Sequence, residues 1–115
     1  MNKNILKNID FETALELSSL VSYQDGQIVS RTFVQNKAVS ITLFSFDQGE
    51  EIRSHESSGD ALVYVLDGSA NITIGDQKFT PAKGQAIVMP SGVPHAVKAL
   101  ERFKMLLVVV FPESN

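Results

Sequence analysis

Cysteine is absent from the 115 residues of the chain, and histidine occurs only twice. Without cysteine, the chain has no disulfide bond, no thiolate nucleophile and no zinc–thiolate site, while the redox compartment stays open. The sequence also lacks a Ser/His/Asp set, a phosphate-binding loop and a nucleotide-binding glycine fingerprint. These absences exclude several common enzyme classes and leave His55 and His95 as the residues to explain.

Positive charge is scarce as well. Thirteen acidic residues against ten basic ones give a net charge of −3, and the basic residues form no run. We therefore expect neither nucleic acid nor an anionic membrane as a partner. The longest apolar run, Met105–Phe111, is far too short to cross a bilayer. Residues 1–21 contain no apolar core of signal-peptide length, so a cytoplasmic location is expected.

The chain has the length of a single domain and contains no linker, repeat or low-complexity tract. We divide it into a lead-in segment, residues 1–26, that packs on the barrel or on a partner subunit, and a β domain, residues 27–115. Within the lead-in, Asp10 is placed to cap a short helix whose apolar residues roughly share one face. This pattern is brief, and an irregular segment is the alternative.

From Ile28 onward, short β-type segments alternate with turns. Val39, Ile41 and Leu43 alternate with polar residues, which is the period-2 pattern of a half-buried strand. Three pairs of small turn residues separate such segments: Asp25-Gly26, Asp67-Gly68 and Gly75-Asp76. About seven to nine strands at roughly 8–12-residue spacing, without an interior helix, predict an all-β barrel or sandwich over residues 27–112.

Two of these segments, Ala61–Leu66 and Met105–Phe111, are apolar on both faces. A small closed barrel needs apolar residues on its inner face only. The outer face of these strands therefore requires cover from a second layer or from a partner subunit. We expect a homodimer.

Two sequence blocks carry a resemblance to a known family. The first, GEEIRSHESSGDALVYVLDG, spans Gly49 to Gly68, and the second, GQAIVMPSGVPHAVKA, spans Gly84 to Ala99. The order and spacing of glycine, proline and histidine in them resemble the two motifs of the cupin superfamily. This resemblance implies a double-stranded β-helix (jelly-roll) barrel, all-β with at most a short N-terminal helix. It agrees with a homodimer, since small cupins commonly pair, often through their N-terminal strands.

Cupins that hold a metal typically bind it with three histidines and one glutamate at these motif positions. Carried over by position, only His55 and His95 remain, because Ser57 and Ala61 stand where the second histidine and the glutamate belong. Two imidazoles fall short of the three protein ligands usual in open zinc sites. Asp60 is the candidate third ligand, but on a regular strand it faces away unless a bulge re-aims it.

We expect the resulting site, with or without Asp60, to bind one divalent transition ion weakly, because water would fill most of its coordination shell. Nickel, copper and zinc are expected ahead of iron and manganese, following the general order of affinity for nitrogen ligands.

The strands are expected to bring the two histidines into one cavity. Pro90 and Pro94 suit a break between strands that carries His95 into the following strand. Arg53 lies two residues before His55, so it shares that strand face and is placed to meet an anionic ligand; a solvated arginine at the rim is the alternative. The predicted ligand-binding residues are Arg53, Ser57, Val63, Val65 and Val97.

Two functions remain open. One is a binding module for a small molecule, favoured because the replacement of two metal ligands leaves an apolar, partly emptied pocket. The other, implied by the resemblance, is a metal-dependent enzyme of the dioxygenase, isomerase or decarboxylase type, acting on a small organic acid or ketone. The sequence assigns no catalytic residue.

Overall fold

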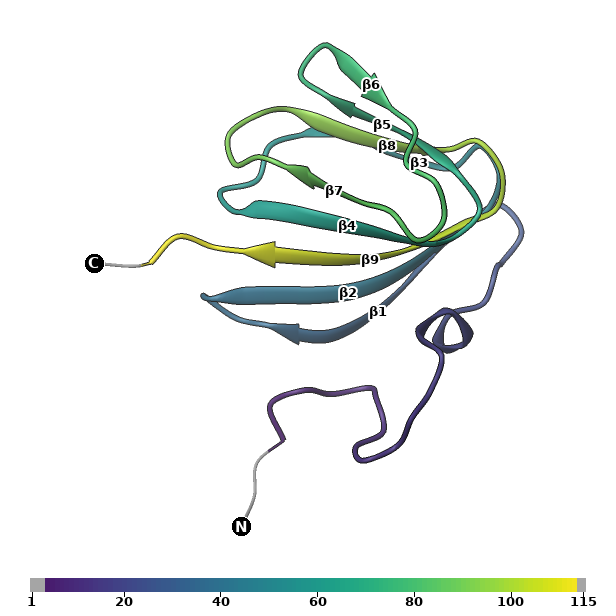
Figure 1. Ribbon diagram of the computed structural model, residues 1–115, viewed down its shortest axis with the longest axis vertical. Coiled ribbons are helices and arrows are strands. Elements are labelled where there is room, and N and C mark those ends of the chain that lie inside the picture. Colours follow the sequence, from purple (N-terminus) through teal and green to yellow (C-terminus); the bar gives the residue numbers. More distant parts are fainter. Residues whose placement is uncertain (1–3, 114–115) are drawn as a thin grey trace.

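The chain folds into two antiparallel β-sheets (Figure 1). The structure is a computed structural model that describes residues 4–113. One sheet has five strands in the order β1-β2-β9-β4-β7, and the other has four in the order β3-β8-β5-β6. The elements are η1 (Leu17–Leu20, a 3-10 turn), β1 (Ile28–Gln35), β2 (Val39–Phe46), β3 (Glu51–His55), β4 (Asp60–Asp67), β5 (Ala70–Ile74), β6 (Gln77–Phe79), β7 (Ala86–Met89), β8 (His95–Ala99) and β9 (Phe103–Val110). The predicted all-β jelly-roll fold is confirmed.

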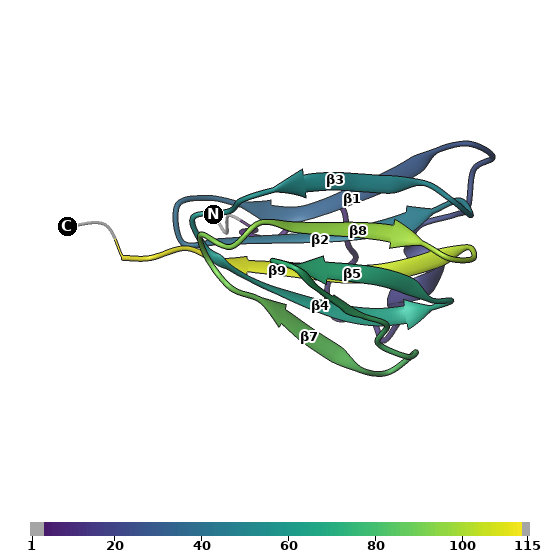
Figure 2. The same ribbon diagram turned by 90° about the horizontal axis from the view of Figure 1, so that it is seen from above.

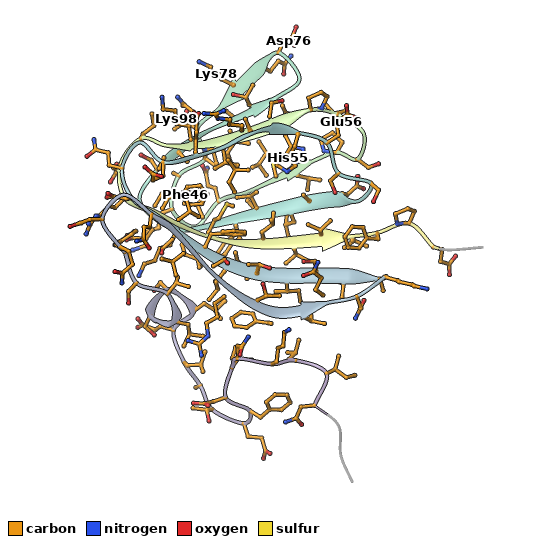
Figure 3. All side chains as sticks on the ribbon, turned by 180° about the vertical axis from the view of Figure 1, so that it is seen from behind. Phe46, His55, Glu56, Asp76, Lys78 and Lys98 are labelled. Atoms are coloured by element: carbon orange, nitrogen blue, oxygen red, sulfur yellow. The ribbon has the colours of Figure 1, made fainter. Side chains whose placement is uncertain are left out.

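The core lies between the two sheets. In β4, Ala61, Val63 and Val65 are buried while Leu62 and Tyr64 point outward, because successive side chains of a strand face opposite sides. The strands run together at one end and spread apart at the other (Figure 1). Phe46 lies between the sheets toward the converging end (Figure 3).

The turn between β4 and β5 explains one of the predicted glycines. Gly68 has a φ of +70°, which a residue with a side chain rarely adopts. A Cβ atom at this position would also overlap with the main-chain carbonyl of Arg102. The turn therefore needs glycine for two reasons, its backbone conformation and its close approach to the β8–β9 connection.

The lead-in segment contains no helix capped by Asp10; its only regular element within the described residues is η1. The chain takes positive φ at Asn8 (61°) and at Glu12 (55°), and such backbone turns interrupt a right-handed helix. The irregular alternative is what the structure has. Arg31 of β1 donates to the carbonyl oxygen of Leu20 (3.1 Å), the last residue of η1, and so ties this turn to the barrel.

Apolar side chains of the lead-in cover part of the outer face of the five-stranded sheet. Val21 packs there with Phe33 of β1 and Leu43 of β2, and Leu17 and Leu20 pack against them. This cluster covers the sheet at β1 and β2. Farther across the sheet, side chains of β4, β7 and β9 on the same face stay exposed. Among the described residues, no helix is long and apolar enough to cross a membrane.

Candidate functional site

Strands β3 and β8 place the two histidines of the chain side by side. His55 and His95 are direct cross-strand partners, and their ring centroids are 4.4 Å apart with the ring planes at 70°. His55 lies toward the end of the barrel where the strands spread (Figure 3), and β3 and β8 run next to each other in the view from above (Figure 2). Two imidazoles forty residues apart in sequence therefore form one edge-to-face pair.

A β-bulge in β3 sets this geometry. Ile52 pairs with Val97 and His55 pairs with His95, so β3 uses one residue more than β8 between the two pairs. Ile52 and His55 consequently both line the cavity, although they are three residues apart. The i, i+2 relation that placed Arg53 on the same face as His55 does not hold here. Arg53 is exposed and is not among the cavity's lining residues.

The histidines close one end of a cavity of about 170 Å³ inside the barrel. Its polar lining consists of His55, Ser57 and His95. Its eight apolar lining residues are Phe44, Ile52, Ala61, Met89, Val97, Met105, Leu107 and Val109. The site is thus an apolar recess with a small polar cap.

Hydrogen bonds to the main chain fix the tautomer of both rings. His55 Nδ1 lies 2.9 Å from the Arg53 carbonyl oxygen, and His95 Nδ1 lies 3.2 Å from that of Val93. Because a carbonyl only accepts, we assign the proton of each neutral ring to Nδ1, which leaves Nε2 with a free lone pair. Among the described residues, every side-chain nitrogen or oxygen that is fully buried has a hydrogen-bond partner. Nε2 of the buried His95 is therefore accessible rather than sealed in the core.

Burial controls the charge of His95, which is only 3% exposed. Loss of solvation lowers the pKa of His95 below its ordinary value, and the charge that His55 would carry lowers it further, while the hydrogen bond with Val93 acts in the opposite direction. At neutral pH the ring of His95 is neutral.

The structure does not bring Asp60 together with the histidines. The carboxylate of Asp60 accepts a hydrogen bond from the Ser91 amide (2.9 Å) and lies in a separate hollow of about 330 Å³, beside Val110. No bulge re-aims Asp60: it pairs with Val110 in regular register with Ala61 and Val109, and only the latter two line the histidine cavity.

Of the predicted lining valines, Val97 lines the cavity, but Val63 and Val65 do not. Both are fully buried in the core, nearer the converging end of β4 than Ala61, and their cross-strand partners Leu107 and Met105 reach the cavity instead. Strand parity gives the face on which a residue lies, but it does not determine whether the side chain reaches the cavity. The lining residue Ala61 was identifiable from its motif position, where it stands in place of an acidic side chain.

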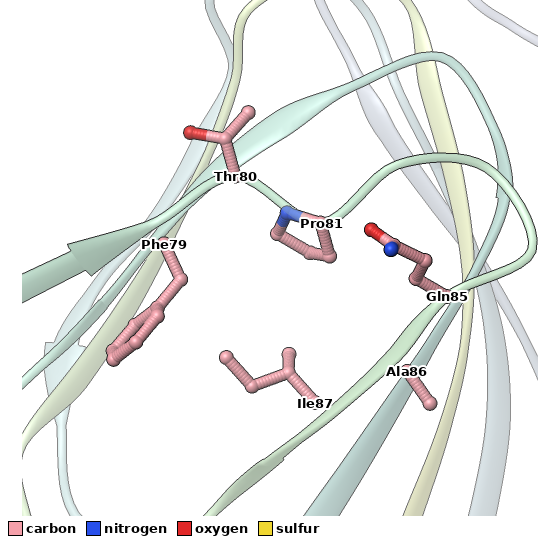
Figure 4. A pocket seen from close by; sticks show the side chains of 6 residues that line it. All are labelled: Phe79, Thr80, Pro81, Gln85, Ala86 and Ile87. Carbon is pink, nitrogen blue, oxygen red and sulfur yellow. The ribbon is translucent and has the colours of Figure 1, made fainter.

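A larger hollow, of about 440 Å³, lies where β6 connects to β7 (Figure 4). It is lined by Phe79, Thr80, Pro81, Gln85, Ala86 and Ile87, none of which titrates. It shares no residue with the histidine cavity. The smaller cavity is therefore the better candidate for chemistry or specific binding.

The residues of the cavity do not fit a three-ligand metal centre. Within residues 4–113, no group of three or more His, Asp or Glu side chains is placed to hold one ion. The donor set is the Nε2 pair of His55 and His95, without a carboxylate. Non-haem iron sites of the oxygenase type use two histidines together with a carboxylate, which this cavity lacks.

Comparisons with known proteins agree with the fold. A family model described as a cupin domain matches residues 42–111. A conserved protein of unknown function from Streptococcus pyogenes is 47% identical, with a TM-score of 0.95 over 97% of this chain and 98% of that chain. A cupin superfamily protein from Desulfitobacterium hafniense is 36% identical, with a TM-score of 0.88 over 93% and 98% of the two chains.

Enzymes also share this fold. Salicylate 1,2-dioxygenase from Pseudaminobacter salicylatoxidans is 17% identical, with a TM-score of 0.67 over 72% of this chain and 26% of that chain. At this identity the likeness concerns the fold alone.

The lowered pKa of His95 predicts how stability depends on pH. Because the unfolded chain takes up this proton more readily than the folded one, the free energy of unfolding should fall as the pH drops below about 6.5, the ordinary value, toward the lowered folded pKa. Urea unfolding followed by circular dichroism at pH 7.5 and 5.0 measures this loss. His95→Gln, which cannot titrate, should show a smaller loss over the same interval. Equal losses for the variant and the parent would contradict the assignment to His95.

Proposed function

The chain belongs to the cupin superfamily, and we propose that it is a small-molecule-binding cupin whose ligand occupies the cavity behind His55 and His95. One observation carries this proposal: an apolar cavity inside the barrel is capped by three polar side chains, from β3, from β8 and from the connection just after β3. Specific small-molecule sites commonly combine an apolar lining with a few placed polar groups. The lining supplies affinity, and the cap orients the ligand.

The volume of the cavity limits the ligand to a small molecule. Drug-sized ligands need pockets of roughly 300–1,000 Å³. The cavity here measures about 170 Å³, close to the roughly 150 Å³ of an engineered apolar cavity that binds benzene. A single six-membered ring with one small substituent matches this space.

Benzene tests whether the cavity accepts a guest. We expect it to shift the methyl NMR signals of Met89 and Met105, which line the cavity. Ala61→Leu, which fills the cavity, should abolish these shifts, whereas the matched variant Ala86→Leu, in the hollow of Figure 4, should leave them unchanged. Circular dichroism checks that each variant is folded, since an added side chain in a core costs about 1–3 kcal/mol. Unmoved methyl signals at saturating benzene would contradict the apolar, ring-sized cavity on which the binding proposal rests.

The alternative function is a metal-dependent enzyme of the dioxygenase, isomerase or decarboxylase type, acting on a small organic acid or ketone. One observation favours it: the two adjacent rings of His55 and His95 each leave Nε2 free, as metal ligation requires. With only two protein ligands, an ion such as Ni, Zn, Cu, Fe or Mn would be held weakly. We therefore rank this function second.

Submillimolar nickel or zinc should raise the melting temperature of the chain. An ion present at a hundredfold excess over its dissociation constant stabilises the folded state by about 2.7 kcal/mol, and each kcal/mol is worth roughly 4–8 °C in a domain of this size. Differential scanning fluorimetry measures the shift. His55→Ala or His95→Ala should abolish it, whereas Asp60→Ala should preserve it, because Asp60 lies outside the cavity.

If no divalent ion shifts the parent protein, the metal-enzyme alternative is removed. A shift that depends on Asp60 as strongly as on the histidines would place that carboxylate in the site and contradict the geometry described above.

We also propose that two copies of the chain pair through the outer face of β4, β7 and β9. Large apolar side chains on this face are substantially exposed: Leu62 (38%), Tyr64 (39%), Val88 (51%) and Val110 (57%). Leu62 pairs directly with Val88, so these exposed side chains lie on adjacent strands of one sheet. An exposed, contiguous apolar patch on a small domain is typical of an interface.

Tyr64→Glu should shift the chain toward monomer or cause aggregation, because a dimer interface would bury the new charge without a partner. Analytical ultracentrifugation at micromolar concentration measures the change. Gln77→Glu, which adds the same charge on exposed β6 of the other sheet, is the matched control and should not change the mass. A monomeric parent protein would contradict the proposed pairing.

A further inference from the structure

The polar cap of the cavity has a definite hydrogen-bonding character, which selects among the molecules that its volume allows. Both imidazoles use Nδ1 to donate to main-chain carbonyl oxygens, those of Arg53 and Val93. The ring nitrogen that each imidazole has left for a ligand is therefore Nε2, which offers a lone pair. Toward a ligand, the histidine pair is a pair of acceptors.

Ser57 supplies the complementary group. Its hydroxyl oxygen accepts a hydrogen bond from the Gly59 amide (3.1 Å), and this leaves the hydroxyl proton free to be donated. Ser57 lines the same cavity as the two rings. The cap thus combines acceptors on His55 and His95 with one donor on Ser57, which is the set that a ligand hydroxyl group needs, because a hydroxyl group both donates and accepts.

The lack of a positively charged side chain in the cavity argues against anionic ligands such as carboxylates. A carboxylate brings only acceptors, and it would face the lone pairs of His55 and His95. No lysine or arginine lines the cavity, and Arg53 is exposed outside it. An anion placed among these apolar side chains would be buried without a positively charged partner, which is costly.

We infer that the ligand of this cavity is a neutral, single-ring-sized molecule with one hydroxyl group, of the phenol class, whose O–H donates to a histidine Nε2 and whose oxygen accepts from Ser57. This inference rests on the proposed binding function and names the ligand class. The ring fills the apolar part of the cavity, between Ala61 and Met105. The hydroxyl group satisfies the cap, which a plain hydrocarbon would leave without a partner.

Three probes of similar size test the inference: phenol, toluene and benzoate. Phenol and toluene have nearly the same shape and differ in one hydroxyl group. At pH 7.5, NMR titration of the methyl signals of the cavity should give phenol the lower dissociation constant, by about 2- to 10-fold, the worth of one net hydrogen bond. Benzoate should bind more weakly than either.

Substitutions of the three polar side chains test which of them cause the preference for phenol. His55→Leu and His95→Leu each remove one acceptor, and Ser57→Ala removes the donor while preserving an apolar lining. The preference for phenol over toluene should disappear in at least one histidine variant and fall in Ser57→Ala, while toluene binding persists. If His95→Leu does not fold, because that ring is buried, Ser57→Ala still decides the question, since the preference must fall in that variant whichever histidine accepts the hydrogen bond.

The outcomes separate the two proposals. Equal binding of phenol and toluene would leave the cavity a binding site but overturn the hydroxyl inference. Tighter binding of benzoate would also overturn it, since the ligand would then be an anion. If none of the three probes binds, both the inference and the proposed function fail. If the preference for phenol persists in all three variants, His55, His95 and Ser57 do not bind the hydroxyl group, and the inference is overturned.

Discussion

The pairing of β3 with β8 is the constraint on which the site depends. β3 is an edge strand, hydrogen-bonded only to β8, so its position is set by that one ladder. The single extra residue between Ile52 and His55 keeps both side chains on the inner face and directs Arg53 away from it. With a regular ladder, Ile52 and His55 would lie on opposite faces of β3, because a slip of one residue exchanges the faces of a strand.

The same local geometry determines the chemistry of the cap. The Arg53 carbonyl oxygen accepts the hydrogen bond from Nδ1 of His55, and the Val93 carbonyl oxygen, in the turn before β8, accepts that from Nδ1 of His95. Main-chain atoms therefore decide which ring nitrogen stays free. The burial of His95 keeps its ring neutral, so this ring offers a lone pair rather than a positive charge.

Much of the fold was accessible from the sequence, because it depends on local patterns. Period-2 alternation and Asp/Gly turns such as Asp67-Gly68 identified the strands, and the motif spacing identified His55 and His95. The bulge in β3 leaves no local signature, so the face of Arg53 was assigned by regular alternation and differs from the structure. Val63 was assigned to the cavity by strand parity, which gives its face but does not determine whether its side chain reaches the cavity. The brief helical pattern after Asp10 gave way to tertiary packing of the lead-in.

The apolar character of the cavity and its lack of a third metal ligand share one origin. In metal-holding cupins, the positions of Ser57 and Ala61 carry a histidine and a glutamate, and here both positions line the cavity with much smaller side chains. Replacing a glutamate by alanine removes a ligand and at the same time opens space beside Met89 and Val109. Because the neighbouring side chains are apolar, that space favours a carbon ring over solvated ions. The two positions that lack metal-ligating side chains are therefore also the ones that leave the cavity apolar and open.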